Sequence, residues 1–251
     1  MDQLPNLGRE QEMLEIMGLK SIDDLFSDIP EEIRSKGPLP LPGPQSEEEI
    51  VRDANKLLGT NVDLDCRPSF LSAGLARNFV PSMVPMIATR GEFLTSYTPY
   101  QPEVSQGMLQ AMWEFQTMIS ELVQLPISNV SMYDASTSAA EAITCAVRVK
   151  SKKVEKPNTV FISELVPPHR MSVIHNYTQG VGIEIIKLPH REDGLLDLEK
   201  ASLASGSCAV YVEQPNSFGI LDEGLIRLRE IVGEKTAIIV GVDVTTLGLV
   251  E

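Results

Sequence analysis

The sequence predicts an α/β protein with a mostly parallel sheet and flanking helices, preceded by a helical N-terminal arm. From residue 158 onward, short runs of β-branched and apolar residues alternate with helical stretches. Such alternation is typical of right-handed βαβ crossovers. Residues 1–60 instead combine short helices with a proline-rich strap. We therefore predict two parts, an arm over residues 1–60 and an α/β domain over residues 61–251.

The arm is predicted from helix caps and prolines. Glu10 to Met17 reads as a short helix, and Ser21 caps a second one. The segment Gly37–Pro44, GPLPLPGP, contains four prolines, which remove backbone donors and favour an extended strap. Ser46 then precedes three glutamates, a favourable start for a further helix because acidic side chains suit the positive end of the helix dipole.

Two helices are expected between the arm and the sheet. After Ser105, apolar side chains recur at spacings of three and four, which predicts one buried face; they are Met108, Met112, Phe115, Ile119 and Leu122. Trp113 and the methionines need no explanation beyond core packing. The second helix starts within residues 134–138, where Ser138 and Glu141 have the spacing of a capping box.

The sheet is predicted from four short strands. Their central residues are 159–162, 183–186, 209–212 and 237–240, and helical stretches near 170–179, 196–205 and 223–232 separate them. Ligands of such sheets bind at the carboxyl ends of the strands, which here are residues 163–164, 213–216 and 241–243. No GxGxxG motif follows a strand, so the pattern does not favour a dinucleotide site.

Composition excludes several functions and indicates a compartment. With 21 basic and 35 acidic residues, the net charge is −14, which disfavours binding to nucleic acid or to an acidic membrane surface. No apolar run has the length of a membrane span. Cys66, Cys145 and Cys208 show no zinc-site spacing and read as free thiols in a reducing compartment, with the latter two in the core. A cytoplasmic location is expected, and no metal site is.

Several segments carry a family resemblance. Gly91–Gln116, and most specifically its run YTPYQPEVSQG, resembles glycine decarboxylase, the P-protein of the glycine cleavage system. Met13–Leu19 and Ser21–Phe26 resemble the N-terminal arm of that family, and Met132–Thr137 resembles its separate subunit 1. Two departures are visible. Ala135 stands where glycine is usual, and the family continues beyond the last residue of this chain, so we expect a truncated subunit 1 or N-terminal half.

The resemblance implies a fold, a reaction and partners. The fold would be an incomplete large domain of the pyridoxal phosphate (PLP)-dependent transferases, aspartate aminotransferase fold type I. The reaction would be that of glycine dehydrogenase: oxidative decarboxylation of glycine with transfer of the aminomethyl group to the lipoyl arm of the H-protein. PLP is expected on the partner, subunit 2, rather than on this chain. The alternative is a non-catalytic structural or regulatory partner of the PLP-bearing subunit.

The resemblance also implies cofactor-side positions. Ser136 and Thr137 lie at a helix start, where that fold holds phosphate; a plain capped helix start is the alternative. His169 occupies the position from which a side chain stacks on the pyridine ring of PLP. The alternative is a histidine at a helix start that forms a hydrogen bond with the backbone. Asp243 occupies the position that pairs with the pyridine nitrogen, or else caps its strand end by bonding residues 245 or 246. Asn216 faces the cofactor side in the family, yet as a bare sequence it signals a turn.

Lysine placement sets the limits of the predicted chemistry. A Schiff base needs a lysine with a depressed pKa. Lys235 precedes the final strand in a surface-turn setting, and Lys187 ends a strand expected at the far side of the sheet. We therefore assign no catalytic residue to this chain, and an independent PLP enzyme is disfavoured. Tyr97, Tyr100 and Gln101, in an aromatic, proline-rich loop, are expected to shape the active-site entrance at the interface with the partner.

Overall fold

The computed structural model describes residues 6–62, 67–68, 78–94 and 97–249. The chain forms two compact units, Met1–Ser69 and Phe70–Glu251, and each is described by itself. Cys66, one of the predicted free thiols, lies outside the described residues. The predicted division into residues 1–60 and 61–251 stays a prediction.

The first unit contains short helices and almost no core. Its elements are α1 (Glu10–Met17), η1 (Ile22–Phe26) and α2 (Glu47–Leu58). At the start of α2, Ser46 Oγ accepts from the Glu49 N–H at 3.3 Å while Glu49 Oε2 accepts from the Ser46 N–H at 2.8 Å, a reciprocal capping box. Among the described residues of this unit, Leu14 alone is buried. The unit therefore gains little free energy from its own packing.

In the described part of the second unit, α3 (Met83–Ala88), α4 (Gly91–Leu94) and α5 (Gln106–Val123) come first along the chain. The prediction of a core face on α5 was wrong for the structure described, because no residue of this helix is buried. Phe115 and Leu122 are exposed, and Trp113 keeps 73% of its surface accessible. A periodic pattern shows which face of a helix is apolar, but only a neighbouring element can cover that face.

The sheet was predicted to be mostly parallel, and all three strand pairings of the described sheet are parallel. Its strands are β1 (Lys156–Ser163), β2 (Glu184–Leu188), β3 (Ser207–Gln214) and β4 (Ala237–Val242), in the order β2-β1-β3-β4. β3 is buried along its whole length. β2 and β4 are the edges of the four-stranded sheet, so Lys187 does lie on an outer strand.

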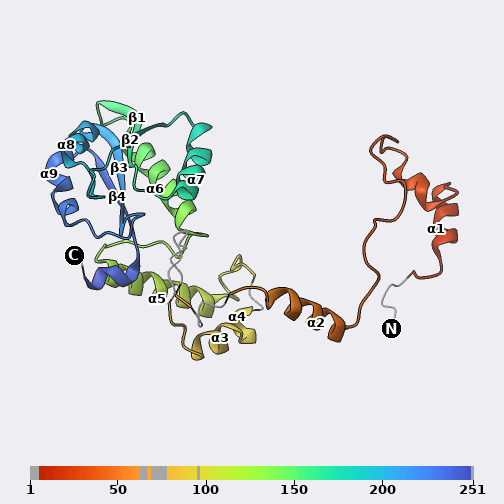
Figure 1. Ribbon diagram of the computed structural model, residues 1–251. Coiled ribbons are helices and arrows are strands. Elements are labelled where there is room, and N and C mark those ends of the chain that lie inside the picture. Colours follow the sequence, from red (N-terminus) through yellow and green to blue (C-terminus); the bar gives the residue numbers. More distant parts are fainter. Residues whose placement is uncertain (1–5, 63–66, 69–77, 95–96, 250–251) are drawn as a thin grey trace. The chain divides into compact units, whose positions relative to one another are not determined.

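Helices cover both faces of the sheet (Figure 1). One face contacts α6 (Ala135–Lys150) and α7 (Pro168–Gln179), with Ile143, Ile162, Ile174 and Tyr211 in the shared core. The other face contacts α8, η2 and α9, with Phe161, Val210, Val212 and Leu228 in a second core. These elements span Leu198–Ala201, Ser202–Ala204 and Leu228–Val232; η3 (Glu223–Arg227) precedes α9, and η4 (Val244–Gly248) follows β4.

Two local predictions need correction. Cys208 is buried in β3, but Cys145 is exposed on α6, since it lies on the side of that helix away from the sheet. The first helical residue of α6 is Ala135, and its capping box pairs Asp134 with Thr137. Ser138 therefore lies inside the helix and does not cap it. Within the described ranges, no helix is long and apolar enough to cross a membrane.

Candidate functional site

The carboxyl ends of the strands, where ligands of parallel sheets bind, form the candidate site. α7 follows β1 directly, so it begins at this edge. α6 leads through a short turn into the amino end of β1, and its own N-terminus therefore also lies at the carboxyl edge. Two helix N-termini, each with partial positive charge, thus meet the ends of β1 and β3.

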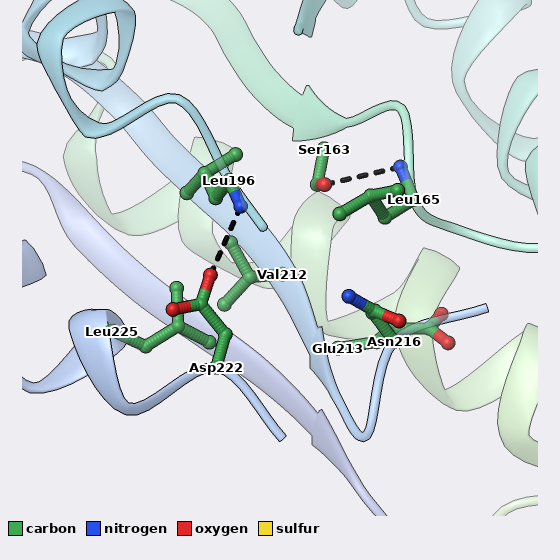
Figure 2. Close-up of a pocket in the computed structure, with 8 residues that line it drawn as sticks. All are labelled: Ser163, Leu165, Leu196, Val212, Glu213, Asn216, Asp222 and Leu225. Carbon is green, nitrogen blue, oxygen red and sulfur yellow. Dashed lines mark hydrogen bonds between the residues drawn. The ribbon is translucent and has the colours of Figure 1, made fainter. Parts of the chain in front are cut away.

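A small pocket opens at this edge (Figure 2). Ser163, Glu213 and Asn216 contribute to its wall from the ends of β1 and β3 and the loop after β3. The remaining lining residues are Leu165, Leu196, Val212, Asp222 and Leu225. Ser163 Oγ accepts from the Leu165 N–H at 3.1 Å, and Asp222 Oδ2 accepts from the Leu196 N–H at 3.0 Å. The polar lining is thus already bonded within the chain.

Asn216 is buried and holds the loop that follows β3. Its Nδ2 donates to the Gly194 carbonyl at 2.8 Å, and its Oδ1 accepts from the N–H groups of Phe218 and Ile220 at 2.9 and 3.2 Å. The loop begins with a cis peptide bond between Gln214 and Pro215. These bonds correspond to the turn alternative given above, and the proposed cofactor-facing role stays a prediction.

A second buried pair, Gln214 and Asp222, also connects this loop to β3 by hydrogen bonds. Gln214 Oε1 accepts from the Asp222 N–H at 2.9 Å, and Gln214 Nε2 donates to the Asp222 carbonyl at 3.2 Å. The Asp222 carboxylate also accepts from the Gly224 N–H at 2.9 Å. Because all three bonds involve buried or half-buried groups, the loop is rigidly attached to β3.

An ion pair lies on the face of β3 that packs against α6 and α7. Val212, in the pocket wall, lies on the other face of the same strand. Arg170, in the first turn of α7, places Nη1 at 2.5 Å from Glu213 Oε1, and the two side chains are only 15% and 6% exposed. Tyr211 Oη donates to the same Glu213 oxygen at 2.9 Å. Burial, reinforced by the negative charge of Glu213, raises the pKa of Tyr211 far above its usual value. Tyr211 therefore stays a neutral hydrogen-bond donor to the carboxylate.

The start of α6 is capped by a carboxylate. Asp134 Oδ1 accepts from the Thr137 N–H at 2.7 Å and from Thr137 Oγ1 at 2.8 Å. These hydrogen bonds lower the pKa of Asp134, and the nearby charge of Arg170 adds a smaller effect in the same direction. Ser136 is buried beside this turn and Thr137 is half-buried. The backbone donor of Thr137 is thus already taken by the chain's own carboxylate.

Asp243 and His169 take different positions at this edge. Asp243 Oδ1 accepts from the Thr245 N–H at 2.9 Å and from Thr245 Oγ1 at 2.6 Å, which lowers the pKa of Asp243. Asp243 therefore caps η4, as the alternative proposed. His169 is exposed in the first turn of α7. Its proposed stacking role, like the ring-pairing role of Asp243, stays a prediction.

The structure places no lysine from β1, β3 or β4 at the carboxyl edge. Lys156 Nζ donates to the carbonyls of Leu203 and Ser205 at 2.6 and 3.1 Å, at the amino end of β1. Lys235 lies 3.7 Å from Glu155, also at the amino edge. Lys187 is exposed on the outer strand β2. With Asp134 at the start of α6 and no Schiff-base lysine placed by these strands, the described residues of this edge do not fit PLP.

The aromatic loop before α5 is open to solvent. Tyr97 and Tyr100 are 95% and 81% exposed, and Gln101 is exposed beside them. The loop is shaped by short-range backbone bonds, from the Tyr100 N–H to the Thr98 carbonyl at 2.8 Å and from the Val104 N–H to the Gln101 carbonyl at 3.2 Å. These side chains are free to meet a ligand or a partner.

Comparison with known proteins identifies the family. The model of the glycine cleavage system P-protein family matches residues 5–251. The chain is 45% identical over 250 residues to the probable glycine dehydrogenase (decarboxylating) subunit 1 of Thermococcus onnurineus, covering 99% of this chain and 54% of that protein. The corresponding protein of Pyrococcus abyssi is 43% identical, with coverages of 99% and 55%.

A solved structure agrees with this assignment. The crystal structure of a glycine decarboxylase (P-protein) of the glycine cleavage system, in inhibitor-bound form, matches with a TM-score of 0.75 and 36% identity over 100% of this chain and 55% of that chain. The protein thus has the α/β fold of PLP-dependent enzymes. The chain belongs to the glycine cleavage system P-protein family. It spans about half the length of the relatives it matches.

Four residues of this edge were not predicted as site residues: Arg170, Tyr211, Glu213 and Asp222. The sequence predicted only a helix near residues 170–179, although Arg170, two residues after the pair Pro167 and Pro168, falls in the first turn of that helix. Tyr211 and Glu213 alternate along β3 and so point to one face, a signal that was available. Asp222 gave none, because its partner Gln214 is eight residues away along a loop whose path only the fold defines.

Proposed function

We propose that this chain is subunit 1, or the N-terminal part, of a glycine decarboxylase of the glycine cleavage system. It takes part in the oxidative decarboxylation of glycine, with transfer of the aminomethyl group to the lipoyl group of the H-protein. The main support is the match of the whole chain to a solved glycine decarboxylase at 36% identity and a TM-score of 0.75. The names of the relatives, each a subunit 1, support the same role.

The cofactor and the partners follow from this role. PLP, which supplies the electron sink for decarboxylation, is carried by subunit 2, because the residues at the carboxyl edge of this chain do not fit it. The further partners are the lipoylated H-protein and glycine. The complex works in the cytoplasm, in keeping with free thiols at Cys145 and Cys208.

Reconstitution tests the proposal. Release of CO2 from carboxyl-labelled glycine is measured with subunit 2 and lipoylated H-protein, with and without this chain. We expect turnover only when all are present, and none from this chain alone with PLP. Equal turnover without this chain would reject a catalytic contribution.

A structural or regulatory partner is the second candidate. The capped start of α6 and the positions of the described lysines support it, since neither offers a site for PLP at the carboxyl edge. In that case subunit 2 alone would retain the chemistry, and this chain would alter only its stability or its affinity for glycine. Turnover by subunit 2 with a normal kcat would support this candidate.

Site roles are proposed for two groups of residues. Ser136, Thr137, His169, Asn216 and Asp243 occupy positions equivalent to a cofactor site, and Tyr97, Tyr100 and Gln101 shape the entrance to the active site on the partner. The exposure of both tyrosines supports the second role, because exposed aromatic side chains are typical of interfaces.

Alanine variants of the loop test that role. We expect Tyr97→Ala and Tyr100→Ala to lower kcat/KM of the reconstituted enzyme by roughly tenfold or more, as loss of an interface anchor does. Tyr177→Ala, at an aromatic position on α7 that is 40% exposed, is the matched control. Unchanged kinetics in the loop variants would discard the proposal.

A further inference from the structure

The carboxyl edge holds the two kinds of donor that bind phosphate. One is the N-terminus of the sixteen-residue helix α6, whose backbone N–H groups and dipole attract anions. The other is the guanidinium of Arg170 in the first turn of α7, mostly buried beside β3. α6 and α7 pack on the same face of the sheet, so both helix starts lie on the same side of the carboxyl edge.

Both kinds of donor are committed to the chain's own carboxylates. Asp134 takes the Thr137 N–H at 2.7 Å. Glu213 takes Nη1 of Arg170 at 2.5 Å and is held in place by the Tyr211 hydroxyl at 2.9 Å. Nε of Arg170 is buried and has no hydrogen-bond partner among the residues that the structure describes. The guanidinium is therefore neutralised, but its hydrogen-bonding capacity is not exhausted.

We infer that Asp134 and Glu213 act as internal anions that keep this edge closed to external phosphate groups. An incoming phosphate would meet two negative charges and would have to displace at least one of them from its donors. The Asp134 carboxylate is the exchangeable one, because it is exposed, whereas the Glu213 carboxylate is buried against Tyr211. Replacement of Asp134 by a neutral residue should open the edge.

Inorganic phosphate is the probe. Thermal unfolding of the 251-residue chain is followed by circular dichroism at phosphate concentrations from zero to 20 mM, with ionic strength held constant by chloride. Serine caps helices as well as aspartate does, so Asp134→Ser removes the charge and keeps the helix start. We expect phosphate to raise the Tm of Asp134→Ser by about 3–5 °C, the shift typical of a millimolar ligand, and to leave the wild-type Tm unchanged.

Asp197→Ser is the matched control. Asp197 also caps a helix, accepting from the N–H groups of Glu199 and Lys200 at 3.1 Å, but it lies at the start of α8 on the other face of the sheet. This variant should show no phosphate-dependent shift. Glu213→Gln provides a second, independent test, because it removes the charge that pairs with Arg170. Phosphate should therefore restore part of the Tm that this variant loses.

Two results would overturn the inference. A saturable rise of the wild-type Tm equal to that of Asp134→Ser would mean that the edge is already open. A shift in Asp134→Ser no larger than in Asp197→Ser would mean that the carboxylate of Asp134 does not control access. Phosphate binding by the isolated chain is independent of the glycine reaction, so either result leaves the reconstitution test of the proposed function unaffected.

Discussion

At the residue scale, the ion pair between Arg170 and Glu213 dominates the electrostatics of the candidate site. Both side chains are largely removed from water, which costs each ion several kcal/mol that only a well-formed partner can offset. The Tyr211 hydroxyl adds one hydrogen bond to the carboxylate. The pair therefore joins the carboxyl end of β3 to the start of α7. This link depends on Arg170, Glu213 and Tyr211 all being present.

Glu213→Gln is predicted to lower the free energy of unfolding by about 3–5 kcal/mol, because Arg170 is left as an uncompensated, mostly buried charge. Urea denaturation measures the change. Asp193→Asn is the control, since its partner Arg191 is exposed, as is Asp193 itself; exposed pairs contribute little, and the midpoint should not move. A similar midpoint for both variants would show that the buried pair is not a structural lock.

Gly241 leaves the space that Tyr211 and Glu213 occupy. A Cβ built on Gly241 would lie 2.7 Å from the Tyr211 hydroxyl and 3.2 Å from Cγ of Glu213. Gly241→Ala is predicted to destabilise the protein by about 1–3 kcal/mol, the usual cost of overpacking. Denaturation midpoints measure this loss.

The control and the rescue are both available in the same chain. Gly107→Ala in α5 meets nothing within 4 Å and should be neutral or slightly stabilising. Adding Tyr211→Phe to Gly241→Ala removes the atom nearest to the new methyl group. If the double variant is as unstable as the sum of the two single variants, steric conflict with the hydroxyl is not the cause.

At the scale of elements, helix starts and strand runs were predictable, whereas contacts between elements were not. The strands and their alternation with helices were confirmed, because β-branched runs and turn residues are local signals. The predicted burial of one face of α5 was wrong, because burial depends on which other element packs against that face. The cap of α6 was misplaced because serine, threonine and aspartate in Asp134–Ser138 are all suitable caps, and only the backbone path selects one.

The cap of α6 predicts a pH dependence. Hydrogen bonds from Thr137 hold the pKa of Asp134 below its usual value of 3.8, so the unfolded chain binds the proton more readily. The stabilisation by Asp134 is therefore complete above about pH 4 and is lost as the pH falls through the lower, folded-state pKa. Asparagine caps without this charge.

Hydrogen exchange at the start of α6 checks this prediction. At pH 6, amide protection in residues 135–140 should be greater in the wild type than in Asp134→Asn. Thermal unfolding of both proteins, followed from pH 6 down to pH 2, should show a difference in Tm that shrinks as the pH falls, because protonation of Asp134 removes its charge. A difference in Tm between the two proteins that stays constant from pH 6 to pH 2 would show that charge plays no part.

At the scale of the whole molecule, β4 is one of the two outer strands of the described sheet, and its side chains are partly exposed. Val240 and Val242 are 45% and 41% exposed, and one edge of β4 has no partner in the four-stranded sheet described. An apolar strand edge favours pairing with other chains. We predict that the 251-residue chain self-associates.

Light scattering tests this association. The double variant Val240→Lys, Val242→Lys should lower the mean particle mass, because lysine on an edge strand disfavours pairing. Ile226→Lys, at an apolar position that is 80% exposed on η3, adds charge elsewhere and should leave the mass unchanged. A monodisperse wild-type monomer would contradict the prediction.

The sequence by itself determined the parallel α/β fold, the strand positions, and the family, because hydrophobic periodicity and the motif over Tyr97–Gly107 are carried by neighbouring residues. Only the tertiary structure decided which side chains meet at the carboxyl edge. Arg170 and Glu213 lie 43 positions apart, and their ion pair forms because β1 and β3 are adjacent in the sheet. Long-range contacts of this kind depend on strand order, and strand order is fixed by the packing of the whole unit rather than by any local pattern.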